Sequence, residues 1–326
     1  MRHGRRLLLG IALLLVTVLA YPLPAQAEDA TLSVPATAPP SVTLSIPAAV
    51  RAGRATYASC AASGVAEATA TIVVEVAAEA GSVWTTVASA ESAVTDGHAD
   101  ARASLVLGRG RWLVRARLVG DPGAVSASAD VAAVGPKVIA LTFDDGPSPR
   151  ITESIMRTLK ARGVHATFFV SGVKARTYPR VVRAQMNAGH TVGSHGYLHK
   201  PLRGRSRAFV RAQVSAARAE LIRATGAAPR WFRPPYGSTD AGVGSAIRAN
   251  GMRQVIWTVD TLDWRFRNTS SVVRRGVVGR DGGVVLMHDA YATTARAVPS
   301  IISSYRSRGF DFVTLDELGA LGYRIR

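Results

Sequence analysis

The chain has 326 residues but only one cysteine, Cys60, so an internal disulfide framework is excluded. Cys60 lies in a strand-rich segment, which predicts a small buried side chain. No internal repeat of fixed period is present. The apolar run at residues 7–20 is too short to favour a permanent membrane span. The sequence therefore predicts ordinary globular folding, and the chain is long enough for two domains.

The first 27 residues are typical of a secretory signal peptide. Three arginines precede the apolar run, and Ala25-Gln26-Ala27 has the small-x-small form of a cleavage site. We expect export, by the general or the twin-arginine route, and a mature chain that is secreted or associated with the cell wall. Residues 28–39 are interpreted as a linker.

Acidic residues are scarce beyond residue 134. Residues 135–326 hold 30 of the 40 lysines and arginines but only 12 of the 22 acidic residues, a net charge of +18. For an exported protein this charge indicates anionic cell-wall polymers as possible partners, unless it only reflects an arginine-rich composition. Nucleic acid is disfavoured by the export signal and by the lack of a basic helix interleaved with aromatic residues. We expect a monomer.

Residues 40–134 alternate apolar and polar positions in short runs, with turn residues about every ten positions. Examples are residues 41–46, 70–76 and 111–119. This pattern predicts an all-β sandwich. The segment 110–116 (GRWLVRA) and the turn that follows it resemble the closing strands of bacterial immunoglobulin-like modules. We interpret the region as a spacer or a wall-contact module.

From residue 135 to 326, strand-like runs alternate with helical patterns, which predicts an α/β domain with a parallel sheet or barrel. Seven strands are expected, including one continuous strand over residues 254–259. Helices are expected to begin near Pro149 and Pro179 and to span residues 206–226.

Polar side chains follow five of these strands in succession. They are Asp144-Asp145, His195 with His199, Arg233, Asp260 with Asp263, and His288-Asp289. The carboxyl ends of the strands form the active face of a β/α barrel, so these groups should converge.

His195 and His199 are four residues apart, and on a helical turn they would face one metal ion. One carboxylate of the Asp144-Asp145 pair would complete an open catalytic site. The other carboxylate could act as a general base, oriented by Arg233.

His288 could donate a proton to a leaving group. Either Asp263 or Asp289 could hydrogen-bond its other ring nitrogen and raise its pKa. These residues alone predict metal-assisted hydrolysis of an acyl bond, with the substrate left open.

The motif set resembles the polysaccharide deacetylases with NodB homology (carbohydrate esterase family 4), which include peptidoglycan N-acetylglucosamine deacetylases and chitin deacetylases. The first motif is matched by residues 142–147 (TFDDGP), which implies Asp144 as general base and Asp145 as metal ligand. The second implies His195 and His199 as the other ligands of a divalent ion, usually Zn²⁺. Gly196 departs from that motif, which has Ser or Thr there, so loop rigidity or metal affinity is in question.

The remaining motifs imply further roles. Arg233 would orient the base, and the Tyr236 backbone N–H would help to hold the oxyanion. Asp263 would tune His288 as general acid. The implied walls of the acetyl pocket are Trp264 and Leu286.

The resemblance implies a distorted (β/α) barrel and a metal-dependent deacetylase of N-acetylglucosamine polysaccharide, first peptidoglycan and next chitin oligomers. Two alternatives stay open. One is an esterase that removes O-acetyl groups, as on xylan. The other is a catalytically silent protein that binds cell-wall glycan.

Overall fold

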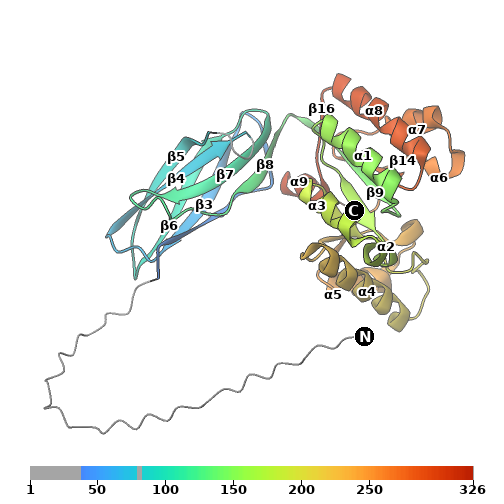
Figure 1. Ribbon diagram of the computed structural model, residues 1–326, viewed down its shortest axis with the longest axis horizontal. Helices are drawn as coiled ribbons and strands as arrows, with labels where there is room; N and C mark the ends of the chain where they lie inside the picture. Colours follow the sequence, from blue (N-terminus) through green and yellow to red (C-terminus); the bar gives the residue numbers. More distant parts are fainter. Residues whose placement is uncertain (1–37, 79–82, 326) are drawn as a thin grey trace, which may run out of the picture. The chain divides into compact units, whose positions relative to one another are not determined.

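The computed structural model describes residues 38–78 and 83–325, so the expected signal peptide lies outside the described residues. The described part before residue 135 is built of strands alone (Figure 1). One antiparallel sheet has the order β1 (Ser41–Ser45), β3 (Ala55–Ser63), β6 (His98–Val106). A second has the order β2 (Ala49–Arg51), β8 (Ala129–Val134), β7 (Gly110–Leu118), β4 (Thr69–Ala77), β5 (Thr85–Ala93), in which only β2 and β8 are parallel.

The two sheets share one apolar core, so the prediction of an all-β sandwich is confirmed. Alternate residues of β3, among them Ala58 and Cys60, pack in the same cluster as Ile72 and Val74 of β4 and Val114 of β7. This alternation follows from the pleat, because successive side chains of a strand face opposite sides. Cys60 is buried, as expected. The immunoglobulin-like resemblance and the domain boundaries stay predictions.

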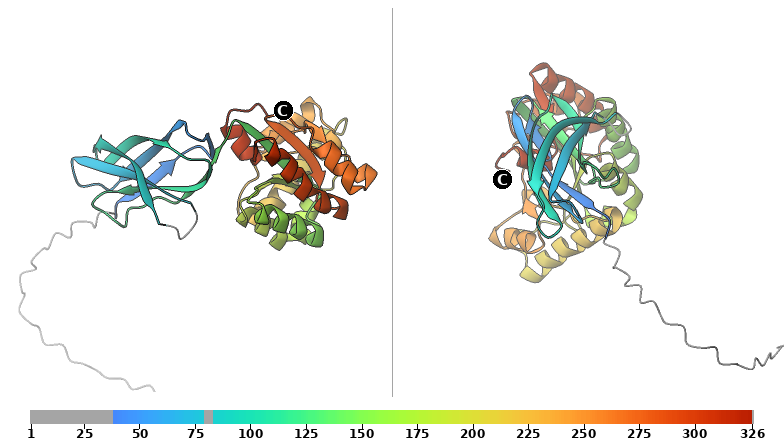
Figure 2. Two further views of the ribbon diagram at one scale, coloured as in Figure 1. Left: turned by 90° about the horizontal axis from the view of Figure 1, so that it is seen from above. Right: turned by 90° about the vertical axis from the view of Figure 1, so that its left-hand side faces the viewer.

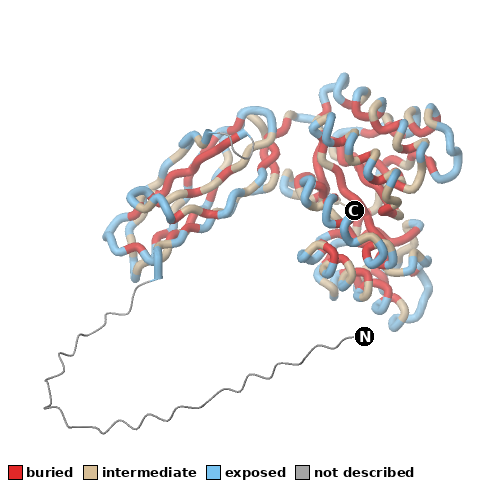
Figure 3. Tube along the Cα trace, in the orientation of Figure 1, coloured by how far each residue is buried: buried red, intermediate tan, exposed pale blue. Residues whose placement is uncertain are grey.

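Beyond residue 134 the chain forms a parallel sheet of eight strands. Its order is β13-β12-β11-β10-β9-β15-β14, and β16 also pairs with β9. The strands are β9 (Lys137–Asp144), β10 (Thr167–Val170), β11 (Thr191–Ser194), β12 (Trp231–Phe232), β13 (Arg253–Gln254), β14 (Val259–Asp260), β15 (Gly283–His288) and β16 (Phe310–Phe312). The sheet curls as in a β/α barrel, as predicted. Strands β9, β10 and β15 are buried along nearly their whole length (Figure 3).

Helices lie outside these strands (Figure 2). They are α1 (Pro149–Ala161), α2 (Gly172–Thr177), α3 (Pro179–Asn187), α4 (Arg207–Thr225), α5 (Ala241–Ala249), α6 (Asp263–Phe266), α7 (Thr269–Gly276), α8 (Ala292–Ser307) and α9 (Leu315–Ala320), with a 3₁₀ turn η1 (Pro235–Gly237). The predicted helix starts are confirmed. Pro149 is the first residue of α1, and the Ser206 side chain caps α4 by accepting a hydrogen bond from the backbone N–H of Phe209. Gly226, with φ +81°, ends α4. Among the described residues, the helices fall short of the length and apolarity needed to span a membrane.

The continuous strand predicted over residues 254–259 is wrong. The chain forms β13, leaves the ladder and enters β14, and these two short strands are the opposite edges of the sheet. Val255 still donates to Phe232, and Thr258 to Val284, so the segment crosses from one edge to the other. Val255 and Val259 are buried at the two edges of the sheet and not in a single strand. The strand count is eight rather than seven, and the barrel stays open at this point.

Candidate active site

The polar residues at the strand ends surround one cavity of about 470 Å³. Asp144 ends β9, His195 follows β11 and His288 ends β15, so parallel strands bring them to the same edge of the sheet. The full lining is Asp144, Asp145, His195, His199, Tyr236, Trp257, Asp260, Trp264, Leu286, His288 and Tyr291. Two further predicted residues, Arg233 and Asp263, lie buried behind this lining and contact it through hydrogen bonds.

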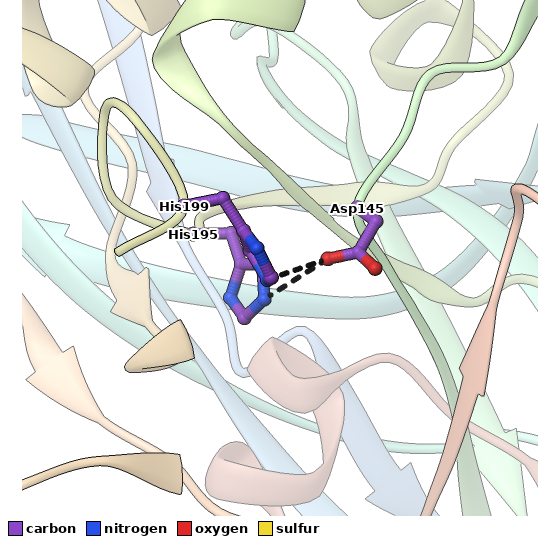
Figure 4. A group of neighbouring side chains, drawn as sticks. All are labelled: Asp145, His195 and His199. Carbon is purple, nitrogen blue, oxygen red and sulfur yellow. Dashed lines mark ion pairs between the residues drawn. The ribbon is translucent and has the colours of Figure 1, made fainter. Parts of the chain in front are cut away.

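Asp145, His195 and His199 form a cluster of three possible metal ligands (Figure 4). Asp145 Oδ1 lies 2.9 Å from His199 Nε2 and 3.4 Å from His195 Nε2, and the three donor atoms all lie within 4.8 Å of one another. Burial alone would raise the pKa of Asp145, but the two imidazoles beside it lower that pKa well below its usual range. The carboxylate is therefore ionised, as a ligand must be.

The donor atoms of this cluster fit a divalent ion. His195 Nδ1 lies 2.7 Å from the carbonyl oxygen of Arg233, which fixes the proton on Nδ1 and leaves the Nε2 lone pair facing Asp145. Asp145 Oδ1 is buried, yet no hydrogen bond of acceptable geometry reaches it from the described residues. One carboxylate oxygen and two imidazole nitrogens gathered within 4.8 Å of one another are the donor set expected around a cation.

The expected helical turn between His195 and His199 is wrong, although the two side chains do converge. The segment is a loop in which Gly196 has φ +71° and His199 has φ +52°, values that an α-helix excludes. Gly172 donates to the Gly196 carbonyl (2.8 Å), and the buried Gln213 side chain accepts from Leu198 N (2.8 Å). Backbone bonds and this amide hold the loop that carries Gly196. Sequence reasoning missed Gln213, because a polar residue on a helix gives no signal of its partner.

Asp144 is held by a buried ion pair. Arg233 Nη1 donates to Asp144 Oδ1 and to Thr142 Oγ1, at 2.8 Å each, and all three side chains are buried. The Arg233 guanidinium also lies 4.2 Å from the centre of the Phe169 ring. Asp144 Oδ2 stays on the cavity side, 3.7 Å from His195 Nε2. The ion pair with Arg233 therefore leaves Asp144 Oδ2 directed at the Asp145–His195–His199 cluster.

His288 is bound to Asp263, so the structure selects one of the two predicted partners. His288 Nδ1 lies 2.6 Å from Asp263 Oδ1, and Asp263 Oδ2 accepts from the His288 backbone N–H (2.8 Å) and from Thr294 Oγ1 (2.6 Å). Burial alone would lower the pKa of His288, but the bond to Asp263 and the charges of Asp144 and Asp145 raise that pKa to about 9. His288 Nε2 lies 4.0 Å from Asp145 Oδ2.

Asp289, the other possible partner, braces the turn after β9 instead. Its Oδ2 accepts a 2.6 Å bond from Thr152 Oγ1, which in turn accepts from Ser148 N. The backbone N–H of Asp289 donates to the Asp144 carbonyl. A Cβ added to Gly146 would lie 2.1 Å from the Asp289 carboxyl, so only glycine fits there. Burial raises the pKa of Asp289 to about 7.

Aromatic side chains form the walls of the cavity. Tyr236 (φ +60°) has a largely exposed side chain, and its ring centre lies 4.7 Å from that of His199. Trp264 is half-exposed, whereas Leu286 is buried. The sequence reasoning missed the lining residues Trp257 and Tyr291. Tyr291 follows His288 by three residues, and that position at a strand end was the available signal.

The protein is thus a β/α barrel that carries three possible metal ligands at the carboxyl edge of its parallel sheet. The family model described as "Polysaccharide deacetylase" matches residues 132–255. A peptidoglycan-N-acetylglucosamine deacetylase of Listeria monocytogenes is 40% identical over 183 residues, which cover 56% of this chain and 39% of the relative. A chitooligosaccharide deacetylase of Bradyrhizobium is 33% identical over 200 residues, which cover 56% of this chain and 91% of the relative.

Among solved structures, a family 4 carbohydrate esterase from Streptomyces lividans in complex with acetate is 36% identical. It has a TM-score of 0.52, and the match covers 54% of this chain and 91% of that chain. The chain belongs to the polysaccharide deacetylase family. It spans about two fifths of the length of the Listeria relative.

Proposed function

We propose that this protein is a metal-dependent hydrolase that removes N-acetyl groups from N-acetylglucosamine-containing polysaccharide, with peptidoglycan as first substrate and chitin oligomers as second. One observation carries the proposal. The buried pair Asp144–Arg233 and the partly buried pair Asp263–His288 flank the Asp145–His195–His199 cluster in one cavity. The similarity to a peptidoglycan deacetylase and to a chitooligosaccharide deacetylase supports this choice of substrate.

Asp145, His195 and His199 would hold the ion, and a donor set of one carboxylate and two imidazoles suits Zn²⁺. When bound, such an ion supplies Lewis acidity toward a carbonyl oxygen and toward water. The Arg233 carbonyl keeps the His195 ring in the tautomer that binding requires.

Asp144 is the proposed general base. Arg233 occupies its Oδ1, so Oδ2 takes the proton of the water whose oxygen attacks the acetyl carbon. The buried guanidinium holds this carboxylate in place through the bond to Oδ1. Positioned donors such as the Tyr236 N–H would hold the oxyanion, and such a donor contributes about 3–4 kcal/mol. Trp264 and Leu286 would enclose the acetyl methyl group.

His288 is the proposed general acid. Its raised pKa keeps it protonated at neutral pH, and Asp263 holds Nδ1, so Nε2 gives its proton to the glucosamine nitrogen as the carbon–nitrogen bond breaks. Acetate and a free amine are the products. An amine leaves poorly unless it is protonated, so a proton donor held in this cavity by Asp263 suits hydrolysis of an amide.

The test is acetate release from N-acetylglucosamine oligomers and from acetylated xylan, by wild type and His288→Ala. We expect release from the amide substrate, reduced about 10²–10⁴-fold in the variant. Release from xylan alone would replace the proposal with the esterase. Glycan binding that is insensitive to chelators and releases no acetate would support the silent alternative.

We also propose that residues 1–27 export the protein to the cell wall. The basic start, the apolar run and the small-x-small end of that segment support this location. Fractionation of cells that express the full-length protein tests it, because protein retained in the cytoplasm would contradict export.

A further inference from the structure

A second cavity, of about 540 Å³, runs along α5 beside the start of α4. It shares no lining residue with the cavity around Asp145, which we call the catalytic cavity. Its rim carries Arg205, Arg207 and Arg211, which are all exposed. Its floor is apolar and includes the buried side chains of Val210, Val243 and Ala246. We name this feature, with its three arginines and its apolar floor, the arginine groove.

The three arginines of the groove form no ion pair with another described residue. The arginines that form ion pairs in described residues 200–250 are Arg223, Arg230 and Arg233, and none of these lines the groove. The one acidic side chain in the lining is Asp240. Its carboxylate accepts from the backbone N–H groups of Val243 (2.9 Å) and Gly204 (3.0 Å), so it serves as a helix cap. Three guanidinium groups therefore face solvent beside an apolar floor.

The arginine groove adjoins the catalytic cavity along two stretches of chain. His199 lines the catalytic cavity, and Arg205 follows six residues later on the groove rim. Tyr236 lines the catalytic cavity, and Asp240 follows four residues later, a span of at most about 14 Å. Two hydrogen bonds join these stretches, from Arg203 N to Ser238 Oγ and from Gly204 N to Asp240 Oδ2. The loops that carry the groove rim therefore lead directly from the lining of the catalytic cavity.

Guanidinium groups bind carboxylates through paired hydrogen bonds, and an apolar floor suits the face of a sugar ring. We propose that the arginine groove binds carboxylates on the same glycan strand that is deacetylated, several sugars away from the reacting acetyl group. The inference rests on the proposed function and deepens it, because it selects a carboxylate-bearing strand such as peptidoglycan over neutral chitin. Free wall polyanions that carry phosphate are the competing source of negative charge.

The test compares full-length wild type with the triple variant Arg205→Gln/Arg207→Gln/Arg211→Gln. A matched control is Arg157→Gln/Lys160→Gln/Arg180→Gln, which removes the same charge from exposed residues of another groove, of about 480 Å³, between α1 and α3. Acetate release is measured on soluble peptidoglycan strands and on neutral chitin oligomers at low and high salt. Circular dichroism and melting temperature show whether each variant is folded.

We expect the groove variant to raise KM for peptidoglycan strands roughly tenfold at low salt, with chitin oligomers changed less than twofold. High salt should remove most of the difference, since exposed charges are screened. The control variant should leave both substrates unchanged. Equal losses on both substrates, equal losses in the control, or no loss would each overturn the inference. Competition by a phosphate polymer as strong as that by a carboxylate-bearing strand would also overturn it.

Failure of the proposed function is separable from failure of this inference. If wild type releases no acetate from either substrate, the proposed function fails. Sedimentation with insoluble peptidoglycan then still tests the groove, because wild type should bind, and binding should fall in the groove variant but not in the control. Equal sedimentation of wild type and groove variant would contradict the inference even in an inactive protein.

Discussion

The two folded regions treat buried polar groups differently. In the described part of the sandwich, the buried polar side chains are Glu75 and Ser126, and Glu75 is paired with Arg115 and Arg117 across neighbouring strands. In the barrel, ionisable groups such as Asp144, Arg233 and Asp263 are buried together at the strand ends. Burying charge costs free energy unless the groups are paired, so a concentration of it marks a site rather than a scaffold.

The same contrast appears in the net charge. Residues 28–134 hold seven arginines and ten acidic residues, whereas residues 135–326 carry a net charge of +18. The described sandwich has one apolar core, whereas the barrel carries both the candidate site and the excess of positive charge. If the barrel alone carries the chemistry, changes in its site should abolish activity, and changes in the sandwich core should leave activity unaffected.

Removal of the metal should have the largest effect. We expect a chelator to lower acetate release by at least about 10³-fold, because the ion supplies charge stabilisation that no side chain of the site replaces. Added Zn²⁺ should restore activity in wild type but much less in His199→Ala. Activity that survives chelation and complete loss of bound metal would contradict the assignment of the Asp145–His195–His199 cluster.

The pH dependence should follow His288. This imidazole must be protonated to act as acid, so activity should fall as pH rises through the pKa of His288, which is about 9 without an ion and lower beside one. Asp263→Asn removes the carboxylate that raises this pKa and should move the alkaline limb down by at least about one pH unit. If the alkaline limb of the pH profile is unchanged in Asp263→Asn, then Asp263 does not set the pKa of the general acid.

Asp289 should influence stability in the opposite sense to a paired carboxylate. Its pKa is raised to about 7 in the folded protein against about 4 when unfolded, so the folded state binds more protons between these values. Stability should therefore fall by roughly 2–4 kcal/mol as pH rises from 4 to 7. In Asp289→Asn this part of the pH dependence should disappear, as measured by chemical unfolding at pH 5 and pH 8. If the free energy of unfolding depends on pH equally in wild type and Asp289→Asn, the pKa of Asp289 is not raised in the folded protein.

A core substitution in the sandwich should leave the chemistry unchanged. Ile72 is buried between the sheets, and Ile72→Ala should destabilise that region by about 2–5 kcal/mol. The kcat on short chitin oligomers should change less than twofold. A large fall in kcat, at a temperature where the barrel stays folded, would show that the two regions do not divide the work.

Much of the fold followed from local pattern. Alternation in residues 70–76 predicted β4, and Pro149, Ser206 and Gly226 marked helix ends that the structure reproduces. The strand-end rule predicted which side chains meet, because parallel strands align their carboxyl ends. Periodicity could not show that residues 254–259 cross between two sheet edges. That outcome depends on which strands pair, and strand pairing is set by distant parts of the chain.

Within the site, a spacing of four between His195 and His199 is compatible with a helix and with a loop. The segment is a loop because Gly196 has a positive φ, which an α-helix excludes. The choice between Asp263 and Asp289 depended on the tertiary position of Thr152, which lies far away in the sequence. The bond between Gln213 and Leu198 could not be predicted for the same reason, because a contact between a helix side chain and a distant loop leaves no local sequence pattern.

Acetate release by Asp144→Asn beside wild type, on N-acetylglucosamine polymer with metal supplied, tests the central claim most directly. The Asp144–Arg233 pair holds the proposed base at the metal cluster, and asparagine keeps its shape but cannot accept the proton. We predict sustained release by wild type and a loss of about 10²–10⁴-fold in the variant, with bound metal retained. No release by wild type, or undiminished release by a folded Asp144→Asn protein, would contradict the account.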